Sequence, residues 1–132
     1  MGVTYLLDTH VVIWLAGRRR PPRTGLLDLL TEDDARSLAS SVSVLEMATK
    51  LRIGKLPDAR QLVDDWTPSL RELGAEELSL TSAHALAAGG LAWGHRDPFD
   101  RLLVGQAQVE RLTLVTADRV MLAAPGIDVL PW

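Results

Sequence analysis

The chain has 132 residues, which suits one domain with a substantial core and is too short for two. It contains no cysteine, which excludes disulfides, thiol nucleophiles and zinc–cysteine sites and fits a reducing compartment such as the cytoplasm. The formal net charge of −3 argues against broad electrostatic affinity for nucleic acid and leaves only local basic patches, such as Arg18–Arg20 with Arg23. The uncharged stretch 78–95 is interrupted by glycine and polar residues, so we expect one globular domain over 1–132 and no membrane span.

The N-terminal part predicts a strand followed by two helices. Residues 3–7 form a short apolar, partly β-branched run that ends at Asp8, which is typical of a buried strand. Apolar residues then recur at helical spacing as far as Gly17, which suits the position after a helix end. A second helix is predicted over 26–34.

Two further helices are predicted before the middle of the chain. Ser43 and Glu46 have the spacing of a capping box, which predicts a helix from Ser43 to residue 52. The pattern of residues 58–73 is amphipathic, and Pro68 is expected to kink or break that helix.

The C-terminal half alternates strands and helices. Asp97 and Pro98 form a strong helix start, with a capping residue followed by proline at the first helical position, and the helix should reach residue 110 or 111. A shorter helix is expected over 81–88. Short strands are predicted at 78–80, 112–116 and 127–130.

Strands that alternate with helices predict an α/β fold of three layers, in which a short central parallel sheet has helices on both faces. In such sheets ligands bind beyond the carboxyl ends of the strands. Asp8 and Asp118 each follow the end of a predicted strand, so we expect both near that edge.

Each acidic residue taken alone has a structural explanation. Asp8 and Asp118 could cap helices, Glu46 suits a capping box, Asp97 suits a helix cap, and Asp100 is favoured in a first helical turn by the helix dipole. Taken together, carboxylates gathered at one edge repel one another unless a cation neutralises them or some are protonated. Oxygen ligands without cysteine suit Mg²⁺, with Mn²⁺ as a substitute. Such a site can generate hydroxide and stabilise a leaving oxygen in phosphodiester hydrolysis.

The order and surroundings of these acids resemble a PIN-domain ribonuclease, specifically the VapC-type toxin of a type II toxin–antitoxin system. The matching segments are LLDTHVVIWL (6–15), SVSVLEMATKLRIGKL (41–56), HRDPFDRLLVGQA (95–107) and LVTADRVM (114–121). The resemblance covers the chain from its first strand to its last helix and implies a single PIN-like nuclease domain over 1–132.

Carried over by position, the resemblance implies that four acids bind Mg²⁺ and catalyse RNA cleavage, namely Asp8, Glu46, Asp100 and Asp118. Asp97 precedes Asp100 by one turn and is a further possible ligand or a supporting carboxylate. We rank Asp100 above it because the helix cap explains Asp97 well.

Other residues near these acids have weaker assignments. Thr9 and Thr116 supply hydroxyls that could hold a water or a ligand carboxylate, although strand-end capping explains them equally well. His10, His84 and His95 are expected to be structural, with His84 having no evident acidic partner. Phosphate contacts are expected from the basic residues that surround the acids, Arg96, Arg101, Arg119 and Lys55.

The resemblance also implies partners, namely an RNA substrate, a cognate VapB-type antitoxin and a second copy of the chain in a homodimer. Two alternatives remain open. One is a catalytically silent module that acts only through its antitoxin. The other is an aspartyl-phosphate phosphatase with Asp8 as nucleophile, which is weakened because His10 stands where that chemistry needs a second acid.

Overall fold

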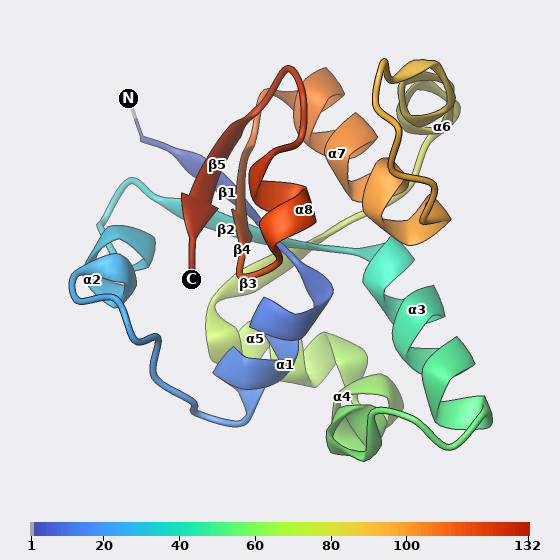
Figure 1. The fold of residues 1–132 in the computed structure, drawn as a ribbon. Coiled ribbons are helices and arrows are strands. Elements are labelled where there is room, and N and C mark those ends of the chain that lie inside the picture. The colour runs from blue at the N-terminus through green and yellow to red at the C-terminus, as the bar shows by residue number, and fades with distance from the viewer. Residues whose placement is uncertain (1) are drawn as a thin grey trace.

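The computed structural model describes residues 2–132, which fold around a central parallel sheet (Figure 1). The strands are β1 (Thr4–Leu7), β2 (Arg36–Ser40), β3 (Ala75–Leu78), β4 (Thr113–Thr116) and β5 (Asp128–Pro131). They lie in the order β3-β2-β1-β4-β5, and every neighbouring pair is parallel. The carboxyl ends of all these strands therefore meet at one edge, with β1 at the centre.

Helices cover both faces of this sheet, so the predicted three-layer α/β fold is confirmed (Figure 1). The helical elements are α1 (Thr9–Ala16), α2 (Leu26–Leu30), α3 (Ser41–Arg52), the 3₁₀ turn η1 (Pro57–Ala59), α4 (Arg60–Asp64), α5 (Trp66–Leu73), α6 (Ser82–Gly90), α7 (Pro98–Glu110) and α8 (Arg119–Leu122). Leu7 of β1 packs with α1, α4 and α5 in one core, whereas its neighbour Leu6 packs with α7 and α8 in another. Among residues 2–132, no helix has both the length and the apolar character needed to cross a membrane.

The predicted capping box at Ser43 is wrong, because α3 begins at Ser41 with Ser40 as its cap. The Ser40 hydroxyl accepts a hydrogen bond from the Val42 amide at 3.0 Å, and Ser40 is also the last residue of β2. The strand therefore passes directly into the helix. Ser43 lies inside α3, and Glu46 is one turn further along, which leaves its side chain free to face α1 rather than its own N-terminus.

Three other predicted boundaries differ from the structure. Helix α2 covers only Leu26–Leu30, and β3 lies at Ala75–Leu78 rather than 78–80. The helix expected over 58–73 is broken at Asp65 instead of Pro68, because Pro68 lies in the first turn of α5, where a missing N–H costs no helical bond. Gly17 does end α1, but the left-handed conformation falls on the next residue, Arg18.

Helices α6 and α7 approach each other closely at Gly105. A Cβ atom there would lie 2.8 Å from both the Ala88 amide nitrogen and the His84 carbonyl oxygen, so only glycine permits this packing. His84 is buried and structural: its Nδ1 accepts from the Thr81 amide at 3.0 Å, and its Nε2 lies 3.2 Å from Glu110. The expectation that His84 has no acidic partner was wrong, because Glu110 comes from α7.

Candidate acidic active site

Asp8 occupies the centre of the carboxyl edge, at the junction of β1 and α1. Its side chain is 6% exposed and is the cap of α1, accepting from the Thr9 amide at 2.7 Å. Its second oxygen accepts from the Thr116 hydroxyl at 2.6 Å, at the end of neighbouring β4. Burial raises the pKa of Asp8, and the charge of Glu46 adds to this, although the hydrogen bonds from Thr116 and Thr9 oppose it.

Glu46 reaches the same place from α3. It is 5% exposed, and its Oε1 accepts from the Thr9 hydroxyl at 2.7 Å. The other oxygen of Glu46 lies 2.6 Å from the ammonium of Lys50, one turn along α3. Thr9 thus links two carboxylates, with its amide on Asp8 and its hydroxyl on Glu46.

Asp97 and Asp100 supply carboxylates from the start of α7. Asp97 is exposed and caps the helix by accepting from the amides of Phe99 and Asp100, at 2.9 and 3.1 Å. Asp100 is more buried, and its Oδ2 lies 2.6 Å from Nε2 of His95. Burial raises the pKa of Asp100 to about 6, aided by the charges of Asp97, Asp8 and Glu46 and opposed by the His95 bond.

Asp118 lies at the same edge but stands apart from this group. It is exposed, and its carboxylate caps α8 by accepting from the Val120 amide at 2.9 Å. Its backbone amide donates to the Thr116 hydroxyl at 3.1 Å, next to Asp8. The structure therefore gathers Asp8, Glu46, Asp97 and Asp100, and it leaves the side chain of Asp118 at the rim.

The carboxylates supply the oxygen ligands that a hard divalent cation prefers. Within the described part of the chain, however, no three acidic or histidine side chains are arranged as a ready-made ion site. The inner carboxylates instead accept hydrogen bonds from Thr9, Thr116, Lys50 and His95. The donor chemistry fits Mg²⁺, and binding would require these side chains to turn toward a common centre.

The pairing of Lys50 with Glu46 was not predicted from the sequence, which only suggested that Lys50 could belong to a basic rim around the acids. Burial alone would lower the pKa of Lys50, but the hydrogen bond and charge of Glu46, together with the charges of Asp97 and Asp100, raise it. The ammonium thus partly neutralises the carboxylates. Its spacing of four residues from Glu46 on one helix was a usable indication of the pair.

Arg101 does not face the acidic group in the way expected of a phosphate contact. Its guanidinium donates five hydrogen bonds of 2.7 to 3.1 Å to the carbonyls of Ala88, Leu91, Trp93 and His95. These bonds use every N–H of the side chain, so none remains for a phosphate. The other proposed phosphate contacts, Arg96, Arg119 and Lys55, are exposed.

The raised pKa of Asp100 leads to a prediction for the metal-free protein. The value of about 6 lies above the 3.8 of an ordinary aspartate, so stability is lost as pH rises through this range. Asp100→Asn removes this charge, and we expect it to raise the free energy of unfolding near neutral pH by about 1 kcal/mol, because solvent screening at this partly exposed carboxyl and the loss of the charged bond to His95 reduce the gain. The gain should shrink on acidification toward about pH 4, as measured by urea unfolding in EDTA. Asp118→Asn is the control, because Asp118 is an exposed helix cap that asparagine replaces equally well, and it should change the free energy of unfolding by less than about 0.5 kcal/mol. If Asp118→Asn stabilises the protein as much as Asp100→Asn does, burial of the Asp100 charge is not the cause of the gain.

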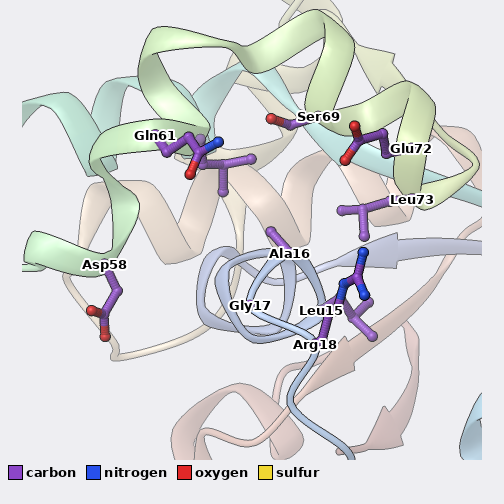
Figure 2. A pocket seen from close by; sticks show the side chains of 10 residues that line it. Leu15, Ala16, Gly17, Arg18, Asp58, Gln61, Ser69, Glu72 and Leu73 are labelled. Atoms are coloured by element: carbon purple, nitrogen blue, oxygen red, sulfur yellow. The ribbon is translucent and has the colours of Figure 1, made fainter.

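A cavity of about 380 Å³ lies away from the acidic group, between the end of α1 and helices α4 and α5 (Figure 2). Its lining includes Leu15, Arg18, Asp58 and Glu72 and none of the gathered carboxylates. The acidic group itself lies at the sheet edge.

Carboxylates that repel one another beyond the carboxyl ends of a parallel sheet define an α/β protein with an acidic site. The sequence matches the PIN domain family over residues 5–127. The chain therefore belongs to the PIN domain family, whose members are generally nucleases. No curated protein sequence is significantly similar to the chain.

Solved structures of the same fold include two of VapBC proteins and one of FitAcB. The chain is similar to one in VapBC2 from Rickettsia felis bound to a DNA fragment from their promoter, with 19% identity, coverage of 98% and 99% of the two chains, and a TM-score of 0.73. It is also similar to a chain in DNA-bound VapBC from Salmonella typhimurium, with 22% identity, coverage of 98% of each chain and a TM-score of 0.69. The similarity to FitAcB from Neisseria gonorrhoeae has 21% identity, coverage of 96% of each chain and a TM-score of 0.62. At these identities the likeness establishes the fold.

Proposed function

We propose that the chain is a divalent-metal-dependent endoribonuclease, with Mg²⁺ as its ion and Mn²⁺ as a substitute. The observation that carries the proposal is the gathering of Asp8, Glu46, Asp97 and Asp100 at the carboxyl edge, where burial and mutual repulsion raise the pKa values of Asp8 and Asp100. A cation would relieve this repulsion. Membership of the PIN domain family supports nuclease chemistry at this site.

Asp8, Glu46 and Asp100 would hold the ion, with Asp97 beside them and Asp118 completing the site from the rim. When bound, Mg²⁺ supplies an acidic water and neutralises charge on a phosphodiester. Thr9 and Thr116 hold the carboxylates of Glu46 and Asp8 through their hydroxyls, and these bonds would have to adjust as the carboxylates turn toward the ion. His95 is hydrogen-bonded to Asp100 and orients that carboxylate.

The same reasoning supports a toxin held inactive by an antitoxin. The similar structures are of VapBC and FitAcB proteins, and the motifs of the chain resemble VapC-type toxins, whose antitoxin could place an arginine or lysine against these carboxylates. Lys50 of the chain itself makes a contact of this kind, since its ammonium lies 2.6 Å from the Glu46 carboxylate. We further propose a homodimer that acts in the cytoplasm.

The deciding experiment uses the purified chain and an end-labelled single-stranded RNA. We expect cleavage with Mg²⁺ or Mn²⁺, complete loss with excess EDTA, and recovery when the metal is restored. Intact RNA under every metal condition would favour a catalytically silent antitoxin-binding module. A DNA strand of the same sequence tests whether the activity requires the 2′-hydroxyl, since carboxylates and metal act on either phosphodiester.

A further inference from the structure

We infer that His10, Trp14 and the arginines of the loop after α1 form a subsite for the single-stranded RNA that flanks the cleaved bond; this rests on the proposed function. We call this group the arginine–tryptophan surface: His10, Trp14, Arg19, Arg20 and Arg23. Nothing in the acidic site accounts for it. Its parts come from one face of α1 and from the segment that connects α1 to α2.

The aromatic side chains of this surface form a continuous row with an arginine. His10 and Trp14 are one helical turn apart on α1, and their ring centroids lie 5.9 Å from each other. The guanidinium carbon of Arg19 lies 4.6 Å from the centroid of the Trp14 ring, within the range of a cation–π contact. An exposed guanidinium held in this way has lost part of its freedom before a ligand arrives, which lowers the entropic cost of binding.

Thr116 and Trp132 connect the row to the acidic group. The Thr116 hydroxyl donates to Asp8, and the Thr116 carbonyl accepts from the Trp132 amide at 2.9 Å. The Trp132 ring lies 5.4 Å from that of Trp14. Because Trp132 directly follows β5, this contact places Trp14 beside the carboxyl end of β5.

The charge of the loop suits a phosphate backbone. Arg18, Arg19, Arg20 and Arg23 are all exposed, and none takes part in a salt bridge found among residues 2–132. Arg20 and Arg23 line one shallow hollow together with Asp28, the acidic residue on that lining. A chain of net charge −3 with a carboxylate centre needs such a local basic region to hold an anionic polymer.

A single strand of RNA fits this arrangement better than an acidic peptide, because aromatic and guanidinium groups adjoin the cleavage site. Bases stack on aromatic rings and guanidinium planes, whereas an acidic peptide would use only the charge. Trp14 lies six positions after Asp8 along α1, or about 9 Å of helix at 1.5 Å per residue. That is about two to three nucleotides at a rise of 3.4 Å in a stacked strand.

The test measures RNA binding separately from cleavage. The affinity of the full chain for a fluorescent 12-nucleotide single-stranded RNA is measured in EDTA, as a function of salt, by fluorescence anisotropy. The variant Arg19→Gln, Arg20→Gln, Arg23→Gln should bind about tenfold more weakly at low salt, and its log–log salt slope should fall by about 2, because each phosphate that is no longer neutralised lowers the slope by about 0.7. Arg19→Lys keeps the charge but lacks the planar group, so it should lose affinity without a change in slope.

A charge-matched control places the same substitutions at the opposite edge of the sheet. Arg36, Arg71 and Arg111 lie at or before the amino ends of β2, β3 and β4, and their triple glutamine variant should bind RNA as the unaltered chain does. Equal weakening in both triple variants, or none in either, would overturn the subsite. Loss of affinity for poly-L-aspartate with unchanged RNA affinity would instead identify a protein-docking surface and also overturn it. If the triple variant of Arg19, Arg20 and Arg23 cleaves RNA with an unaltered KM, the subsite is refuted and the proposed nuclease function is not. If the unaltered chain binds RNA through these arginines but does not cleave it, the proposed nuclease function is refuted and the subsite is not.

Discussion

Asp8→Asn is expected to reduce RNA cleavage by at least about a hundredfold, since even the outer partners of a metal site commonly contribute 10- to 100-fold. Asp8 lies at the centre of the carboxyl edge, and asparagine removes one anionic ligand without changing side-chain volume. The substitution should leave the fold intact. Asparagine caps a helix as well as aspartate, so the bond from the Thr9 amide is retained. Burial raises the pKa of Asp8 because it disfavours the charged carboxylate, so replacing that charge with a neutral amide should increase the free energy of unfolding.

Cleavage rate and stability should therefore respond in opposite ways to this substitution. The rate is followed on end-labelled RNA with saturating Mg²⁺, and stability is followed by urea unfolding in EDTA. Asp128→Asn is the matched control, because Asp128 is exposed and begins β5 at the opposite edge of the sheet. Full activity in Asp8→Asn would rule out the acidic group as the active site. If Asp8→Asn does not fold, the cleavage rate of Asp100→Asn tests the same assignment.

Arg101→Met is expected to lower the free energy of unfolding by about 2–4 kcal/mol and to slow cleavage, while RNA binding in EDTA stays unchanged. The methionine fills much of the same space but leaves the carbonyls of Ala88, Leu91, Trp93 and His95 without their shared donor. Those carbonyls shape the segment between α6 and α7, which carries His95 against Asp100. Loosening this segment should lower kcat rather than raise KM.

Arg101→Lys separates this positioning role from a direct phosphate contact. Lysine keeps the positive charge but offers three donors from one atom, so it should recover only part of the lost stability. A phosphate contact predicts the reverse pattern, with normal stability in Arg101→Met and a salt slope for RNA binding that falls by about 0.7. That pattern would show that Arg101 leaves its carbonyl partners to bind RNA.

Local patterns in the sequence predict most of the architecture correctly. Short apolar runs ending at Asp8 and near Asp118 correspond to β1 and β4, because consecutive buried positions in a parallel sheet leave a continuous apolar stretch. The Asp97–Pro98 start of α7 was also correct, since capping and proline geometry depend only on neighbouring residues. Helix breaks were less well predicted. The break at Asp65 depends on how α4 and α5 pack, and propensity alone pointed to Pro68.

The four acids and their order along the chain could be chosen from the sequence, but their relative positions could not. Strand and cap patterns are local, so the amino-acid sequence was sufficient to predict a parallel α/β fold with carboxylates following its strands. The folded structure was needed to show that Asp8, Glu46, Asp97 and Asp100 share one electrostatic environment, whereas Asp118 caps α8. It also decided that Lys50 faces the acids and that Arg101 holds backbone carbonyls. A side chain's partners come from segments far apart in the chain, so spacing along the sequence cannot specify which donor a carboxylate or guanidinium meets.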